Sequence, residues 1–465
     1  GGNNTAIGKS ALTTNTSGSF NVAVGSLALD ANTTGSQNVS AGGSSLSTNS
    51  TGSYNVALGH GALFQNTTAN YNTAIGQTAL NVNTTGASNV AVGAEALDAN
   101  TTASNNTAVG RSALGANTTG TANTGLGARS LEDTTTGSNN TGIGYQALES
   151  NTTGTQNVSV GSGALFANTT ASNNTAVGFF ALEVNTTGTN NVAVGSLSLD
   201  ANSTGGANTA IGMQALSSNT TASNNTAVGL NALFANTTGT RNAAFGGLSL
   251  DAVTTGNDNV GIGYQAATGV TTGSQNTALG SAALNATTTA SNNTGVGYLA
   301  LAANTTGASN TSMGSEALDA NTTGGFNVAI GRQALTNNTT ASNNTAVGRL
   351  ALGANTTGSQ NVAVGALALD ANTTGQSNTA VGYNSLTANT TGSENTATGW
   401  QALMSNTTAR FNAAFGLGTL QNNTTGEQNT ALGQQSLFDN TTASNNTAAG
   451  YRALFANTTG TQNVA

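Results

Sequence analysis

The sequence predicts an all-β protein, a parallel β-solenoid or β-roll in which 27 identical-length coils stack along one axis with a 17-residue period. Glycine recurs with this period, at Gly8, Gly25, Gly42, Gly59 and onward to Gly450, with no insertion or deletion. Proline is absent, as expected where backbone N–H groups are used in ladders throughout. A helical repeat would need about 33 residues or more to hold two helices, so a 17-residue period favours a β coil.

The repeating unit reads Asn-(Thr/Val)-Ala-(Val/Ile/Leu)-Gly-x-x-Ala-Leu-x-(Ala/Asn)-Asn-Thr-Thr-Gly-x-x. We number its positions as slots 1 to 17, starting at the asparagine that precedes each recurring glycine in the unit. Slots 6, 7, 10, 16 and 17 vary freely and carry nearly all of the charged and aromatic residues. The other slots form a framework that we expect to stack in columns: Asn4, Asn21, Asn38 and Asn55 at slot 1, Gly8, Gly25, Gly42 and Gly59 at slot 5, Leu12, Leu29, Leu46 and Leu63 at slot 9, and Asn15 and Asn32 at slot 12.

Each coil is expected to contain two short strands, at slots 1–5 and slots 8–11. Glycine at slot 5 permits a bend at positive φ, and the Asn-Thr-Thr-Gly run closes the loop. Coils stacked in register would place identical residues about 4.8 Å apart, so that a row of asparagines becomes an amide ladder. We expect each of these amides to hydrogen-bond its neighbours and to hold a left-handed backbone turn.

The strand residues indicate two kinds of face. Slot 4 is apolar almost everywhere, as in Ile7, Val24 and Leu58, and slot 9 is leucine except at Ala267. Slots 3 and 8 are almost always small, and neighbouring strand residues point to opposite faces. We therefore predict one large apolar face inside the solenoid and one small, flat face, which suggests that chains lie side by side.

Composition excludes several classes of function. Only 5% of residues are charged, the net charge is −8, and Lys9 and seven arginines are scattered, so we expect no nucleic-acid partner. No apolar run approaches the roughly 18 residues of a membrane span, so we expect no membrane insertion. Cysteine is absent, and neither a metal nor a cofactor is expected. Residues 1–465 read as one continuous array without caps, which we interpret as part of a longer chain.

The string Asn-Thr-Ala-Val-Gly-x-x-Ala, as in Asn106 to Ala113, resembles the head repeats of YadA-like trimeric autotransporter adhesins, and it also resembles repeat regions of phage tail fibres. The resemblance extends over the whole chain. It implies a left-handed parallel β-roll with three chains around one axis. The head unit of that family is typically shorter, because it lacks the Asn-Thr-Thr-Gly extension of the present unit.

No catalytic site is predicted. The single histidine, His60, lies at variable slot 6 without a recurring partner. Glu132 and Asp133 form a doublet that we expect to be solvated. Six aspartates at slot 10 lie several coils apart, too far for a glycosidase pair: Asp30, Asp98, Asp200, Asp251, Asp319 and Asp370.

The sequence therefore favours a non-enzymatic structural protein, the rigid shaft of an extracellular fibre or filament on a cell or virion surface. Its expected partner is itself, as a homotrimer or an end-to-end filament. One alternative is an ice- or surface-binding solenoid that uses the threonines of slots 13 and 14. A second is an adhesin that binds a host ligand or glycan through its variable slots, and a third is a phage tail-fibre shaft. The Asn-Thr-Thr run also matches an N-glycosylation acceptor.

Overall fold

The computed structural model describes residues 1–465 and confirms the predicted fold class. The chain is all-β, with 27 strands of three residues each and no helix, and each coil of the solenoid contributes one strand. Two compact units are distinguished, Gly1–Asn231 and Ala232–Ala465. Both carry the same 17-residue period.

All strands occupy slots 2 to 4. In the first unit they are β1 (Thr5–Ile7), β2 (Val22–Val24), β3 (Val39–Ala41), β4 (Val56–Leu58), β5 (Thr73–Ile75), β6 (Val90–Val92), β7 (Thr107–Val109), β8 (Thr124–Leu126), β9 (Thr141–Ile143), β10 (Val158–Val160), β11 (Thr175–Val177), β12 (Val192–Val194), β13 (Thr209–Ile211) and β14 (Thr226–Val228). In the second unit they are β15 (Ala243–Phe245), β16 (Val260–Ile262), β17 (Thr277–Leu279), β18 (Thr294–Val296), β19 (Thr311–Met313), β20 (Val328–Ile330), β21 (Thr345–Val347), β22 (Val362–Val364), β23 (Thr379–Val381), β24 (Thr396–Thr398), β25 (Ala413–Phe415), β26 (Thr430–Leu432) and β27 (Thr447–Ala449).

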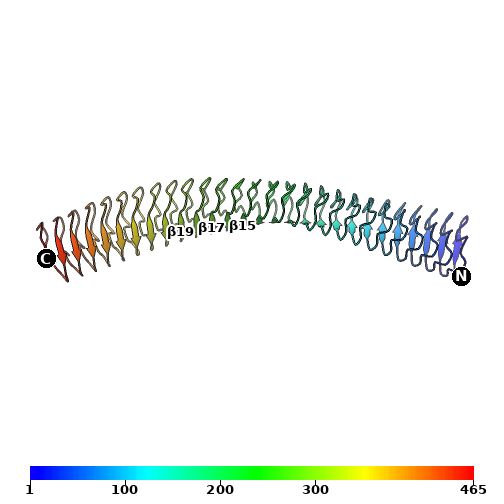
Figure 1. Ribbon diagram of the computed structural model, residues 1–465, viewed down its shortest axis with the longest axis horizontal. Coiled ribbons are helices and arrows are strands. Elements are labelled where there is room, and N and C mark those ends of the chain that lie inside the picture. The colour runs from blue at the N-terminus through cyan, green and yellow to red at the C-terminus, as the bar shows by residue number, and fades with distance from the viewer. The chain divides into compact units, whose positions relative to one another are not determined.

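Within each unit, every strand pairs in parallel with the strand of the next coil, in register. Thr175 of β11, for example, lies between Val158 of β10 and Val192 of β12. Strands that follow one another in the chain therefore lie side by side, as in the run from β15 through β17 to β19 within the second unit, where every second strand is labelled (Figure 1). The predicted in-register stacking of successive coils is confirmed within each unit.

The predicted second strand at slots 8–11 is wrong, because slots 6–11 form turns in every coil. The backbone is left-handed at slots 7 and 9, as at Phe180 (φ 50°) and Leu182 (φ 55°), and an extended strand cannot include such residues. Coil-to-coil hydrogen bonds nevertheless continue there: the Leu165 N–H donates to the Ala181 carbonyl at 3.0 Å. The left-handed conformation costs a leucine about 1–2 kcal/mol, and burial of its side chain offsets that cost.

Glycine at slot 5 is required by both backbone conformation and space. Gly178 has a φ of 140°, and a Cβ added there would lie 2.5 Å from the carbonyl oxygen of Gly195 in the next coil. Gly8, Gly25, Gly42 and Gly59 have φ angles of 129°, 137°, 144° and 133°. The corner predicted at this slot is confirmed, and any side chain would force neighbouring coils apart.

The predicted assignment of the faces is partly wrong. Leucines at slot 9 are fully buried from Leu29 onward through most of the chain, as predicted. The small residues at slot 3, such as Ala23 and Ala57, are also fully buried. The slot 4 side chains lie outside instead, with Leu126 46% exposed and Leu279 44% exposed.

The narrow width of the coil explains the small residues at slot 3. A Cβ added to Gly142 would lie 2.6 Å from Ser130 Oγ and 3.0 Å from the Ala147 carbonyl oxygen, both from slot 8 on the opposite wall. Where slot 3 is serine, as in Ser159, its hydroxyl donates to that wall, here the Ala164 carbonyl, at 2.7 Å. Smallness is thus imposed by the same chain, and it no longer argues for a neighbouring chain.

Candidate functional site

The slot 1 asparagines form the first buried ladder. The Oδ1 of Asn21 accepts the backbone N–H of Asn38 at 3.0 Å, and Asn21 Oδ1 and Asn38 Nδ2 lie 3.1 Å apart. The ladder starts with Asn4, whose Oδ1 accepts the Asn21 N–H at 2.8 Å, and continues to Asn55. Asn21, Asn38 and Asn55 are fully buried, so these amides are available only to the chain itself.

The slot 12 asparagines form a second ladder that meets the first. Asn32 Nδ2 donates to Asn15 Oδ1, and Asn49 Nδ2 donates to Asn32 Oδ1, each at 2.9 Å. Asn49 Nδ2 also donates to the Gly52 carbonyl at 2.9 Å, and Asn38 Nδ2 donates to the same oxygen at 2.9 Å. Both ladders therefore converge, in most coils that carry them, on the carbonyl oxygen of slot 15.

The slot 1 asparagines are not themselves the left-handed residues of the turns beside their amides. The residue before the slot 1 asparagine is left-handed instead, as at Phe20 (φ 60°), Gln37 (φ 60°) and Tyr54 (φ 61°). Residue type at slot 17 varies, although asparagine, which tolerates this conformation well, is the commonest residue there, as at Asn105 and Asn173. The asparagine amides fix the chain on either side of the left-handed residue.

The second ladder is interrupted where slot 12 is not asparagine, at Thr134, Val253, Val270 and Thr287. At the first interruption the buried Oδ1 of Asn117 has no hydrogen-bond partner. Asn151 Nδ2 reaches Thr134 Oγ1 only at 3.5 Å. A buried polar atom without a partner costs about 1–3 kcal/mol, so this coil is a weak point.

The slot 10 aspartates serve the stack. Asp200 accepts a hydrogen bond from Ser217 at 2.6 Å, and Asp251 accepts one from Thr268 at 2.6 Å, in each case from slot 10 of the next coil. Asp30, Asp319 and Asp370 have the same kind of partner, in Ser47, Thr336 and Thr387. The exception is Asp98, because slot 10 of the next coil is Gly115, which has no side chain to donate a hydrogen bond. Burial raises the pKa of the Asp98 carboxyl. An Asp followed one period later by Ser or Thr is a pattern that reasoning from the sequence missed.

The two threonine rows differ. Slot 13 hydroxyls donate to the slot 13 carbonyl of the next coil, as from Thr101 to Thr118 at 3.1 Å and from Thr322 to Thr339 at 3.1 Å. Slot 14 is threonine in every unit except the first, where Ser17 stands, and its side chain is exposed in every coil. Only slot 14 therefore displays a regular row to solvent. The slot 12 asparagines from Asn32 to Asn440 are buried, and an N-linked glycan could not reach them in the folded chain.

The charged residues gather at one place in the first unit, on the ridge formed by slots 6, 7 and 10, which we call the turn ridge. Arg129 is ion-paired with Glu132 at 2.5 Å and with Glu149 at 2.7 Å. Burial raises the pKa of the Glu149 carboxyl, and the Arg129 guanidinium opposes that rise. The expectation that the Glu132–Asp133 doublet is solvated is met only in part. Asp133 is exposed, whereas Glu132 is half-buried and ion-paired.

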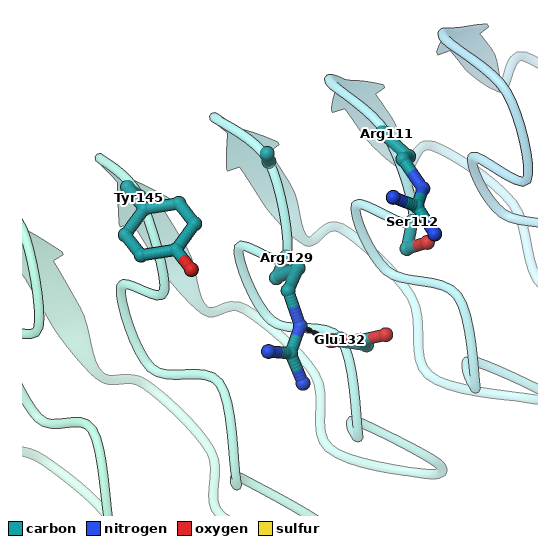
Figure 2. Close-up of a pocket in the computed structure, with 6 residues that line it drawn as sticks. Arg111, Ser112, Arg129, Glu132 and Tyr145 are labelled. Atoms are coloured by element: carbon teal, nitrogen blue, oxygen red, sulfur yellow. Dashed lines mark hydrogen bonds and ion pairs between the residues drawn. The ribbon is translucent and has the colours of Figure 1, made fainter.

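Two cavities open on the turn ridge. The larger, about 470 Å³, is lined by Arg111, Ser112, Ala128, Arg129, Glu132 and Tyr145 (Figure 2). The smaller, about 280 Å³, is lined by His60 with Ser44, Gly61, Phe64, Thr78 and Asn81. No group of three or more His, Cys, Asp or Glu side chains is placed to hold a metal ion. The chain has no helix that is long and apolar enough to cross a membrane.

Comparison with known proteins identifies no relative of this chain. No protein-family model matches the chain, and no curated protein matches it.

Completing the interrupted ladder should stabilise the solenoid. Thr134→Asn would give Asn117 Oδ1 a donor and Asn151 Nδ2 a closer acceptor. We expect a gain of about 1–3 kcal/mol in the first unit, measured as a rise in the midpoint of thermal unfolding followed by circular dichroism. The control is Thr136→Asn at exposed slot 14, which should leave the midpoint unchanged. A lower midpoint for Thr134→Asn would contradict the ladder as described.

Proposed function

We propose that this protein is a structural element, the rigid shaft of an extracellular fibre or filament on a cell or virion surface, built from several copies of the chain. The observation that carries the proposal is the outer surface of the parallel sheet, formed by slots 2 and 4, which we call the strand face. The strand face repeats in every coil, and most of its residues are aliphatic or threonine.

The strand face has the chemistry of a lateral interface. No charged residue occurs at slot 2 or slot 4 anywhere in the chain. Exposed aliphatic side chains such as Leu126, Ile143 and Ile211 follow one another along the first unit, and Ile262, Leu279 and Met313 do so along the second. Soluble monomers rarely expose contiguous apolar patches of more than roughly a few hundred Å². Covering this face with further copies of the same chain would remove its apolar surface from water.

The proposed number of copies is three. The resemblance of the slot 1–8 string to the head repeats of trimeric autotransporter adhesins supports this number. Three chains around one axis would turn all three strand faces inward and leave the turn ridges outside. The buried asparagine ladders would give each chain a fixed register before assembly.

Charges on the strand face should prevent assembly. We expect the full chain, of 45.2 kDa, to sediment as a trimer at micromolar concentration. Arginine at three consecutive slot 4 positions, Val160, Val177 and Val194, should weaken association at least tenfold, because burying unpaired charges is costly. Analytical ultracentrifugation measures both species.

The matched control places the same three charges at slot 14, by Thr170→Arg, Thr187→Arg and Thr204→Arg. This variant should assemble as the original chain does. A wild-type chain that stays monomeric would overturn the proposal, and equal weakening by both variants would show that the strand face is not the interface.

The exposed threonine row at slot 14 favours a second candidate, binding to ice or another regular surface. Its hydroxyls and methyl groups repeat at the coil spacing of about 4.8 Å, whereas the slot 13 hydroxyls are used within the chain. If the row binds ice, the chain shows thermal hysteresis, and Thr→Lys at slot 14 in alternate coils reduces it several-fold. Absence of hysteresis in the unmodified chain would reject this candidate.

A further inference from the structure

The larger cavity on the turn ridge is a feature that the repeat does not generate. Slot 6 runs from Arg111 through Ala128 to Tyr145 in three consecutive coils, and the short alanine leaves a gap between two long side chains. Figure 2 shows Tyr145 and Arg111 on either side of that gap, with Arg129 and Glu132 along its lower edge. A volume of about 470 Å³ is within the range of small-molecule pockets, which is roughly 300–1,000 Å³.

Several polar groups of this pocket are held in place. Arg129 is fixed by its two ion pairs, to Glu132 in its own coil and to Glu149 in the next coil. Ser112 Oγ lies 3.2 Å from a carboxylate oxygen of Glu95. Arg111 is the freer cation, because its side chain is 77% exposed and its nearest carboxylate, that of Glu95, is 3.9 Å away.

The charge balance selects the kind of ligand. Two arginines, Arg111 and Arg129, lie among five carboxylates that interact with them or with one another, of which one lines the pocket itself: Glu95, Asp98, Glu132, Asp133 and Glu149. An anion would therefore meet net repulsion. A metal ion is disfavoured too, because no three of these carboxylates are placed to ligate one. A neutral ligand with both donors and acceptors can accept hydrogen bonds from the guanidinium groups and donate hydrogen bonds to the carboxylate.

We propose that this pocket binds a saccharide. The exposed ring of Tyr145 offers a flat surface for the apolar face of a pyranose ring. The guanidinium of Arg111 offers planar donors to sugar oxygens, and the carboxylate of Glu132 accepts from sugar hydroxyls. Ligand pockets combine apolar and aromatic surface with a small number of placed polar groups, and this pocket offers one aromatic ring among polar side chains.

The same chain provides a matched control. Tyr298 also occupies slot 6 and is 54% exposed, close to the 53% of Tyr145. Its coil carries Leu299 at slot 7 and Ala302 at slot 10, where the pocket coil has Gln146 and Glu149 and the coil before it has Arg129 and Glu132. Tyr298 thus offers a comparably exposed ring, with the short Ser281 before it at slot 6 as Ala128 stands before Tyr145. It lacks the neighbouring arginines and glutamate.

The experiment uses the full chain and a panel of methyl glycosides of glucose, galactose, mannose and N-acetylglucosamine. Saturation-transfer NMR and calorimetric titration should show binding of at least one glycoside, with a Kd on the order of 1 mM, as expected for a small ligand in an open site. Tyr145→Ala and Arg111→Gln should each weaken that binding about tenfold. Both side chains are exposed, so folding is expected to persist, and the thermal midpoint checks it.

Three outcomes would overturn the proposal. The first is no binding of any glycoside to the unmodified chain. The second is an equal loss of binding in Tyr298→Ala, which would indicate nonspecific contact with exposed aromatic rings. The third is that arginine methyl ester, added as a cationic probe, binds at Tyr145 and Arg111 and no glycoside does. The pocket belongs to one chain, so these results do not depend on whether the chain assembles into a fibre.

Discussion

The structure depends on the convergence of two buried asparagine ladders on one backbone carbonyl in most coils that carry both. Asn38 and Asn49 both donate to the Gly52 oxygen, and their own Oδ1 atoms receive hydrogen bonds from the next coil. Burying an amide without partners would cost several kcal/mol, so a coil that slips out of register loses several bonds at once. This constraint accounts for the unbroken 17-residue period.

A second constraint, the narrow width of each coil, determines the outer surface. Only small residues fit at slots 3 and 8 beside the buried slot 9 leucine. Larger apolar side chains at slot 4 have no room inside and lie on the strand face. The narrow core thus leaves an apolar exterior, and that exterior is the observation behind the proposed lateral assembly.

Much of the fold was predictable from the sequence, because periodicity and residue identity carry it. The coil length, the parallel stacking, the slot 5 corner, the burial of the slot 9 leucines and both amide columns followed from recurring Asn, Gly and Leu. The second strand was predicted wrongly because leucine gives no sign of a left-handed backbone, as at Leu182. The faces were misassigned because alternation along a strand tells which residues share a face and not which face is inside.

The candidate sites were harder to predict. The slot 10 aspartates looked isolated, although comparison of the same slot in successive units would have paired Asp200 with Ser217. The pocket beside Tyr145 depends on the sizes of Arg111, Ala128 and Tyr145 in successive coils, and it becomes visible only when the units are stacked. Reading such a chain by columns, as well as along its length, is what finds these features.

The most direct test of in-register stacking is a cysteine cross-link, because the natural chain contains no cysteine. Thr153 and Thr170 occupy exposed slot 14 in neighbouring coils, and Thr187 occupies the same slot one coil further. Coils spaced about 4.8 Å apart place the first pair within the Cα separation of a disulfide, about 4.4–6.8 Å, and the outer pair beyond it. Oxidation of the Thr153→Cys/Thr170→Cys monomer should therefore close an intramolecular disulfide, and the Thr153→Cys/Thr187→Cys monomer should not. Closure of the outer pair in preference to the inner pair, or closure of neither, would contradict the stacked solenoid.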